Sequence, residues 1–576
     1  MATPQFVCAN WSADNTGCKK FGKYTCNGCH LVVYCGSDCQ KSHWALHKID
    51  CKSPLGNEAW RPGWVLERRD PKFMVKVGSI YPSFADEKRL WGNIPAIDVL
   101  QLESNEGIGY GKQLNLLFAA SGDLRNVVKT IAQVPDGYTK PIEVTINDND
   151  LDVVARNAII LLIALVSENA EEAVDCIIHV WYSALIRKSD LDMLQQKVRP
   201  LIESACEKIK DKDPNSLLGK TWRFKKGSLR LVLPKSLWDR LLAYVSIPEG
   251  LTAEQASCIR TAVTLARSKR DYLDLHLIFQ SPSRRVAKQR FRQDGLLLPF
   301  GAPRHEFQEP NPTLFHVRNV WPMASSADPL QGWSLKDVED SSSGPASADI
   351  YGKLYNHIHT VLRAFLSRIT DSQVSFRLFC ETTLVLTGTR LLESGYFDRI
   401  EVSNMSDNCF NGIHQTLFLI AFLLQAPLAN PHATLITLFR NAIPETLSKQ
   451  DVTAALFTDH PETRLMRSSI AHRAIVNGYE YLPDHHMSDP KVIQWVYAQA
   501  NLSNYDAIFE RFMMEVGFSE LKELFRVVMK EKHTVIEKWP FRPKLRHGQP
   551  GAMEEFVRLN NEVVFAKDRY VEWRRC

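Results

Sequence analysis

The sequence predicts a small two-zinc module at the N-terminus, then a large α/β domain of the doubly wound type with a helical insertion, and a mainly helical C-terminal region. Three observations predict this fold class. Seven of the thirteen cysteines fall within the first 51 residues. Two apolar segments farther along each end in small or polar residues and lead into a helical pattern. Long amphipathic patterns fill most of the remaining chain.

The composition is that of a globular protein with more than one folded unit. The chain has 576 residues, of which 45% are hydrophobic and 23% are charged, and its net charge is +5. Such a slight charge neither indicates nor excludes a polyanionic partner, because nucleic-acid binding needs clustered charge. No apolar run reaches the ~20 residues of a membrane-spanning helix, and the first residues lack a secretory pattern. We therefore expect a cytoplasmic or nuclear protein.

The N-terminal cysteines have the spacing of a zinc module over residues 1–52. From Cys18 the pattern is C-x7-C-x2-C-x5-C-x3-C, followed by His47 and Cys51. Zinc prefers thiolate and imidazole ligands in fours, and a structural site leaves no position open for water. Residues four apart lie on one face of a helix, so His47 and Cys51 can reach one ion. The predicted ligands of two zinc ions are Cys8, Cys18, Cys26, Cys29, Cys35, Cys39, His47 and Cys51.

Zinc is also expected to hold this module together. About 50 residues cannot bury enough apolar surface to fold alone. A structural zinc can contribute on the order of 10–16 kcal/mol in finger peptides. We therefore expect that removing zinc unfolds the module.

The segment CNGCHLVVYCGSDCQKSHWALHKIDC resembles the MYND finger almost position by position. The resemblance implies interleaved ligands, with one ion bound by the first, second, fifth and sixth ligands in chain order and the other ion by the remaining four. It leaves His43 without a metal. Cys8 departs from the family, because nine residues separate it from Cys18 where two are usual.

The same resemblance implies a binding role for the finger. MYND fingers bind short proline-containing peptides, and the family residues that match Gln40 and Trp44 line the peptide groove. The alternative is that Trp44 packs the small hydrophobic centre, and an amphipathic indole can do both.

Residues 53–88 are rich in proline and glycine and are interpreted as a linker or covering segment. The first part of the α/β domain follows at 89–169. A strand at Leu114–Ala119 ends near Gly122 and Asp123, and a second at Ile142–Ile146 ends near Asp148. In doubly wound folds an acid at the second strand tip often holds a ribose. Only one glycine occupies the first turn, so the dinucleotide fingerprint is incomplete.

Three stretches here, WGNIPAIDVL, NLLFAASGDLRNVVKTIA and TINDNDLDVVARNAIILL, resemble an uncharacterised domain that follows MYND fingers in many fungal proteins. A remoter resemblance is to dynein axonemal assembly factors. These resemblances imply a Rossmann-like fold similar to class I methyltransferases. S-adenosylmethionine would then lie with its methionine part near Gly122 and Asp123 and its ribose on Asp148. The alternative is that both acids cap helices or form turns.

The rest of the chain divides by pattern. Residues 170–288 are expected to be a helical insertion, 289–349 a loop-rich connector, 350–450 the second part of the α/β domain, and 451–576 a mainly helical region. Within these ranges we expect a mobile loop at 321–348, a helix at 350–369, and strands at 399–402 and 433–439. Asn404 and Asp407 would be substrate-side residues of an enzyme.

Three functions compete, and no catalytic residue is identified. The favoured hypothesis is a zinc-binding adaptor or scaffold whose finger recruits a proline-containing partner. The alternative is an S-adenosylmethionine-dependent methyltransferase. A third hypothesis, nucleic-acid binding, draws on SPSRRVAKQRFRQ and KWPFRPKLRHGQ. A lysine methyltransferase with an inserted MYND finger is excluded, because its Asn-His-Ser-Cys segment is missing.

Overall fold

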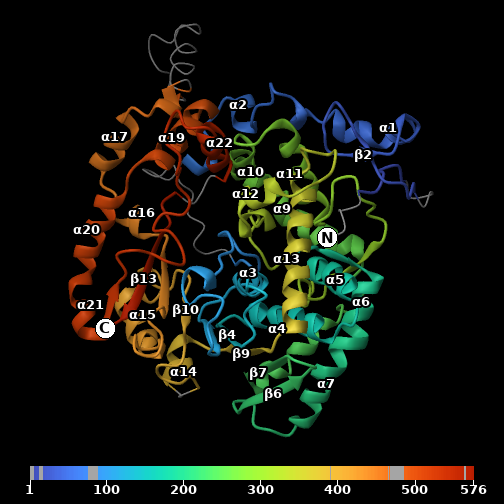
Figure 1. The fold of residues 1–576 in the computed structure, drawn as a ribbon. Coiled ribbons are helices and arrows are strands. Elements are labelled where there is room, and N and C mark those ends of the chain that lie inside the picture. The colour runs from blue at the N-terminus through green and yellow to red at the C-terminus, as the bar shows by residue number, and fades with distance from the viewer. Residues whose placement is uncertain are drawn as a thin grey trace.

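Six parallel strands form the centre of a nine-stranded sheet in the computed structural model (Figure 1). The structure describes residues 6–11, 17–74, 88–388, 391–464, 466, 486–562 and 566–576. In this part of the chain the strand order is β12-β13-β11-β10-β3-β4-β9-β7-β6, with β13 and β6 antiparallel to their neighbours. The strands are β3 (Leu114–Phe118), β4 (Ile142–Asp148), β6 (Leu217–Arg223), β7 (Ser228–Pro234), β9 (Val374–Cys380), β10 (Arg399–Glu401), β11 (Thr434–Phe439), β12 (Val527–Met529) and β13 (Arg569–Arg575).

The order reverses between β3 and β10. Without the inserted β6–β7 hairpin, the parallel strands β3, β4, β9, β10 and β11 lie in the order 3-2-1-4-5, which is the doubly wound order. In such sheets, ligands bind beyond the carboxyl ends of the strands at the reversal. This position, between β3 and β10, is called the switch point below.

Alternate strand residues point to opposite faces, and each face has its own core. Leu116 and Phe118 belong to one buried cluster, whereas Leu117 belongs to the other. The first cluster includes residues of α3 (Arg125–Ala132), α4 (Leu151–Val166), α5 (Ala170–Tyr182) and α13 (Ile350–Asp371); the second includes residues of α14 (Thr383–Gly388), α15 (Gly412–Ile420), α16 (Ala442–Thr446), α20 (Asp506–Val516) and α21 (Leu521–Phe525). The domain therefore has three layers.

The remaining elements surround these layers. They are α2 (Gly63–Leu66), α6 (Lys188–Met193), α7 (Arg199–Lys208), α8 (Lys235–Trp238), α9 (Ala253–Thr264), α10 (Arg270–Leu277), α11 (Pro282–Asp294), α12 (Leu335–Asp340), α17 (Lys449–Phe457), α19 (Pro490–Leu502) and α22 (Ala552–Glu562), with the small antiparallel pair β5 (Leu185–Arg187) and β8 (Phe307–Pro310). Among the described residues, no helix combines the length and the apolar character needed to cross a membrane.

The strands expected from the sequence are present with small changes in their ends, and α13 begins at the expected residue. A large, mostly parallel α/β domain with many helices is therefore confirmed. Two regions differ from the expectation. Residues 170–288 also contribute β6 and β7, which extend the sheet at one edge, and the chain after residue 451 supplies β12 and β13 at the other edge. The segment 321–348, expected to be a mobile loop, contains α12 and buries Trp333.

Candidate metal centre and the switch point of the sheet

The N-terminal finger is a short hairpin followed by one helix, at the upper right of Figure 1. The hairpin pairs β1 (Tyr24–Thr25) with β2 (Val33–Tyr34), and α1 (Ser37–Cys51) follows. An extended segment before the hairpin is held by main-chain hydrogen bonds, in which the N–H of Cys8 donates to Lys20 (2.9 Å) and the N–H of Cys18 donates to Asn10 (2.9 Å). These bonds bring Cys8 back to the rest of the finger despite the long loop.

Eight side chains converge in two groups, and within each group all ligand atoms lie within 4.8 Å of one another. In the first group, the sulfur–sulfur distances are 3.7 Å between Cys18 and Cys35 and 3.5 Å between Cys35 and Cys39. In the second group, the sulfur atoms of Cys26 and Cys51 lie 3.8 Å apart. With Zn–S bonds of about 2.3 Å, tetrahedral ligands lie about 3.8 Å apart. A disulfide needs about 2.05 Å. The groups are Cys8, Cys18, Cys35 and Cys39, and Cys26, Cys29, His47 and Cys51.

The chemistry of these donors also fits zinc. Burial lowers the pKa of His47 to about 4, so its imidazole is neutral at physiological pH and has a lone pair for a metal. The pKa of Cys35 is raised to about 12, first by its hydrogen bond with Cys39 and then by burial. Four crowded thiols become thiolates together only when a cation offsets their charge. The prediction of two zinc-site clusters is therefore confirmed.

Other polar residues of the finger have separate roles. His43 hydrogen bonds through Nδ1 to the Tyr34 hydroxyl (3.0 Å), and its ring stacks on His47 at 6.1 Å. Trp44 lies edge-on to His47 at 6.1 Å and is 36% exposed. Gln40 precedes Trp44 by one helical turn, so both lie on one face of α1. The structure thus brings the two predicted peptide-binding residues together at the surface.

The finger is packed against the large domain rather than tethered to it. The indole Nε1 of Trp11 donates to the carbonyl of Gly301 (2.8 Å), and Ser283 Oγ donates to the carbonyl of Cys29 (2.7 Å). A Cβ at Gly301 would come 2.8 Å from the Cβ of Ala9, so the two backbones approach closely. Buried residues of the finger belong to the main core cluster. The finger and the domain therefore share one continuous core.

The basic run SPSRRVAKQRFRQ forms most of α11 and supports this junction. Arg290 Nη1 forms an ion pair with Asp50 of the finger (2.6 Å), and Arg285 donates to the carbonyls of Leu55 (2.8 Å) and Asn57 (2.8 Å). Arg292 is buried and donates within the domain. These arginines are engaged by internal partners, which gives the basic run a structural role.

Two predicted cofactor residues meet at the carboxyl ends of β3 and β4, next to the switch point. The N–H of Gly122 donates to Asp148 Oδ2 (3.0 Å), and burial raises the pKa of Asp148. Gly122 has a φ of +54°, in the left-handed region that favours glycine. Asp123 faces elsewhere, because it pairs with Arg125 (2.6 Å) and accepts from the indole of Trp181 (3.3 Å). Asp123 and Asp148, the two acids predicted to bind a cofactor, thus both have hydrogen-bond partners within the protein.

The carboxyl ends of β10 and β11 are joined in the same manner. Asp407 accepts hydrogen bonds from the N–H groups of Arg440 (3.0 Å) and Asn441 (3.1 Å) and from the amide of Asn404 (3.2 Å). Burial raises the pKa of Asp407 to about 6, and that of the neighbouring Glu401 to about 7. Sequence reasoning missed Glu401, because a charged residue inside a short strand resembles a surface position.

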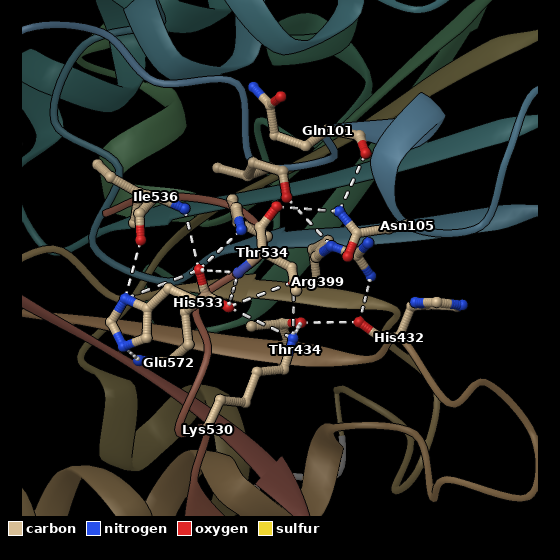
Figure 2. Close-up of polar contacts among 12 residues, drawn as sticks. Gln101, Asn105, Arg399, His432, Thr434, Lys530, His533, Thr534, Ile536 and Glu572 are labelled. Carbon is tan, nitrogen blue, oxygen red and sulfur yellow. Dashed lines mark hydrogen bonds and ion pairs between the residues drawn. The ribbon is translucent and has the colours of Figure 1, made fainter. Parts of the chain in front are cut away.

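A second buried polar network, shown in Figure 2, lies where β10 and β11 begin, at the amino ends of the parallel strands. Glu572 of β13 accepts from the N–H groups of Thr534 (2.9 Å), Val535 (2.8 Å) and Ile536 (2.9 Å). Arg399 of β10 pairs with Glu106 (2.8 Å), and neither side chain is exposed. Ligands of doubly wound sheets bind at the carboxyl ends of the strands, so this network lies away from the expected ligand position. Its role is structural, because it ties the C-terminal strand β13 to the rest of the domain.

Two family models match separate parts of the chain. Residues 14–51 match the family model of the MYND finger, and residues 90–186 match that of a domain of unknown function, DUF4470. Dynein axonemal assembly factor 3 of Xenopus laevis is 26% identical over 161 residues, which cover 23% of this chain and 33% of that protein.

Two further relatives match over shorter stretches. Histone-lysine N-methyltransferase ASHR1 of Arabidopsis thaliana is 57% identical over 28 residues, and N-lysine methyltransferase SMYD2-B of Danio rerio is 38% identical over 45 residues. These stretches cover 5% and 8% of this chain, and 6% and 10% of those proteins. The chain thus spans a third or less of the length of these curated relatives. No solved structure matches the chain. The chain therefore carries a MYND finger with two zinc-site clusters and a DUF4470 domain, and it is distantly similar to dynein axonemal assembly factor 3.

Proposed function

We propose that this chain is a zinc-dependent adaptor whose finger binds a proline-containing peptide of a partner protein. The observation that carries the proposal is the exposure of Trp44, which remains 36% exposed although the finger is packed against the large domain. The contacts of the finger with that domain come from other residues, such as Trp11 and Asp50. In the described part of the chain, the indole of Trp44 is therefore accessible to a partner.

Zinc has a structural role in this proposal. The eight clustered residues would hold two ions in closed sites, and closed sites have no position for water or substrate. The ions would fix the orientation of α1 against β1 and β2, and thereby the position of Trp44. Thiolate clusters of this kind persist in a reducing compartment such as the cytoplasm or the nucleus.

The large domain would act as a scaffold for the finger. Its core includes residues of the finger, so a peptide bound to the finger would be held at a fixed position relative to the rest of the chain. MYND fingers bind protein partners, and the distant relative is named an assembly factor. Both fit a chain that brings other proteins together.

A pulldown with the full zinc-loaded chain tests the proposal. Trp44→Ala removes the exposed indole, and buried aromatic anchors of this kind contribute about 2 kcal/mol or more to binding, or about 30-fold in affinity. We expect the variant to lose its proline-containing partners while keeping two zinc ions. The matched control is Ile49→Ala, which removes an exposed apolar side chain of the same helix. An unchanged partner profile for Trp44→Ala would contradict the adaptor role.

One observation favours a second candidate, S-adenosylmethionine-dependent methyl transfer. The strand order is doubly wound, and Asp148 lies at the tip of the second strand beside Gly122. Against it, Asp123 is fully engaged, and the methyltransferase relatives match too little of the chain to support a shared activity. Calorimetry with millimolar S-adenosylmethionine separates the two candidates, because a scaffold releases no heat of binding.

A further inference from the structure

The hairpin of β6 and β7 forms one open edge of the nine-stranded sheet, at the bottom of Figure 1. β6 pairs with β7 on one side, and no strand of the described residues lies on its other side. At about 3.4 Å per residue, the seven residues of β6 form an edge roughly 24 Å long. Such an edge can pair with a further strand unless charge, a bulge or another element prevents it.

Half of the main-chain groups of β6 face away from β7. The N–H of Phe224 donates to Gly227 at the turn (2.9 Å), and the N–H of Lys235 donates to Ser216 at the other end of the hairpin (2.9 Å). Hydrogen-bonded pairs alternate along an antiparallel ladder, so the even-numbered residues of β6 are bonded to β7. The N–H and C=O groups that point outward belong to Leu217, Gly219, Thr221 and Arg223.

The hairpin is also strongly basic. Residues 217–234 contain five cationic side chains and no acid. Asp213 and Asp239, the acids that flank the hairpin in the sequence, accept from Asn215 and pair with Lys235, respectively. None of the five cations forms an ion pair with a described carboxylate. These cations are Lys220, Arg223, Lys225, Lys226 and Arg230.

Two of the arginines lie on one face of this edge. Arg230 of β7 is opposite Thr221, and its Nη1 donates to the Thr221 hydroxyl (3.3 Å). A Cβ at Gly219 would come 2.9 Å from Arg230 Nη2, so this guanidinium lies across the backbone of β6. Arg223 is on the same face as Thr221, and both arginines are exposed. Side chains of an added strand would lie about 4.5–5.5 Å from their neighbours on β6, within reach of both arginines.

The open edge and its charge together define the occupant. A second copy of β6 would place cations opposite cations, which is destabilising. Single-stranded nucleic acid is bound by aromatic rings on which its bases stack, but Trp222 is 6% exposed and Phe224 is half-buried. A negatively charged polypeptide in extended conformation can use both the outward main-chain groups and the arginines.

We propose that the β6 edge binds an extended acidic segment of a partner protein as a further strand, in which alternate residues are carboxylates that face Arg223 and Arg230. In such complexes the main-chain hydrogen bonds provide affinity and the alternate side chains provide specificity. The hairpin lies at the bottom of Figure 1 and the finger at the upper right, so binding here is independent of peptide binding by the finger.

The probe is the fluorescein-labelled peptide acetyl-TEVEVET-amide, whose glutamates share one face of a strand. Fluorescence anisotropy with the full zinc-loaded chain measures its affinity. We expect saturable binding by this peptide and none by its charge-reversed counterpart TKVKVKT. Two further peptides carry N-methyl groups, one on the glutamates and the other on the valines. In an antiparallel strand the glutamate N–H groups face β6, and in a parallel strand the valine N–H groups do. One of the two, and not the other, should therefore bind at least about tenfold more weakly than the parent.

Variants of the hairpin separate the backbone edge from its charge. Thr221→Pro removes an outward N–H without removing a bond to β7, and it should weaken binding at least about tenfold. Thr221→Ala keeps this N–H and should bind as the wild type does. Arg223→Gln should weaken binding roughly threefold. Its matched control is Arg267→Gln, which changes an exposed arginine outside the hairpin and should have no effect.

Two controls guard these measurements. Thermal unfolding shows whether each variant is folded, and the N-methylated peptides test the wild type alone, so a misfolded variant does not spoil the experiment. Trp44→Ala should bind the probe normally, and loss of binding in this variant would place the probe on the finger and overturn the proposal.

Three further results would also overturn it. The first is no saturable binding of the acidic peptide by the wild type. The second is equal binding of the parent and both N-methylated peptides, which would mean contact by charge without an added strand. The third is a labelled oligothymidine that displaces the probe and binds more tightly to the wild type than to Arg223→Gln, which would make the hairpin a nucleic-acid surface.

Discussion

The finger and the sheet domain are stabilised in different ways, although they share a core. In the finger, eight side chains at fixed spacings meet at two points, where two zinc ions would each stabilise the fold. In the sheet domain, parallel strands are buried on both faces, and charged residues at the strand ends are paired inside the protein. The comparison shows that metal ligands can be predicted from their spacing in the sequence, whereas the partner of a buried charged residue cannot.

The largest effect should follow zinc removal. A structural zinc contributes on the order of 10–16 kcal/mol in finger peptides, so chelation should unfold the finger and leave the sheet folded. Hydrogen exchange checks this prediction: amides of α1 should lose protection, and amides of β3 and β4 should keep it. Metal analysis should return two zinc ions per chain for the wild type and one for Cys8→Ser.

Cys258→Ser is the matched control for Cys8→Ser, because Cys258 is exposed and lies outside both clusters. It should keep two ions. If Cys8→Ser also kept two ions, Cys8 would not be a ligand and the first site would need another donor. If chelation unfolded the strands as well, the two regions would form one cooperative unit.

A smaller effect should follow loss of the buried ion pair in the sheet. Glu106→Gln leaves Arg399 buried without its carboxylate partner, which costs about 3–5 kcal/mol in comparable proteins. Denaturant unfolding of the sheet should show this loss, while the zinc content stays at two. Asp340→Asn breaks an exposed pair with Lys336 and should change the free energy of unfolding by less than about 1 kcal/mol. If the two substitutions lowered the free energy of unfolding equally, burial would not be the reason for the larger contribution of the Glu106–Arg399 pair.

The smallest effect concerns pH. Burial raises the pKa of Asp568 to about 7 from its ordinary 3.8, and Arg440 lies 3.3 Å away without removing that shift. The folded state thus binds the proton more tightly than the unfolded state, and stability falls as pH rises from about 4 to 7. Asp568→Asn should remove this cost and stabilise the protein at pH 8 by at most about 4 kcal/mol, because each pKa unit of the shift corresponds to about 1.4 kcal/mol.

Thermal unfolding at several pH values checks the prediction for Asp568. The gain of Asp568→Asn over the wild type should disappear below about pH 3, where the wild-type carboxyl is protonated in both states. A gain that is the same at both pH values would show that the substitution acts through packing instead.

The sequence predicts the zinc clusters and four parallel strands well for physical reasons. Zinc requires a fixed set of donors, and the strands buried on both faces, such as β3 and β11, consist mainly of apolar residues. The strand β13 is different, because its sequence RYVEWRR contains four charged residues. Its buried Glu572 is held by three N–H groups of a distant loop and by an ion pair with Lys530, and no local pattern indicates these partners.

The candidate sites were predictable to different degrees. Gly122 and Asp148 follow adjacent strands, so their meeting could be expected. The indole that engages Asp123 belongs to Trp181, which is 58 positions away in the sequence, so no spacing rule could show that Asp123 is occupied.

The position of β13 has a consequence for how the chain matures. This strand lies between β11 and β12, yet it follows β11 by about 130 residues in the sequence. Until residues 569–575 are available, the fully buried strand β11 has an unpaired edge, and such edges recruit other chains. A product truncated before residue 569 would therefore aggregate or be degraded by cellular quality control even with an intact, zinc-loaded finger.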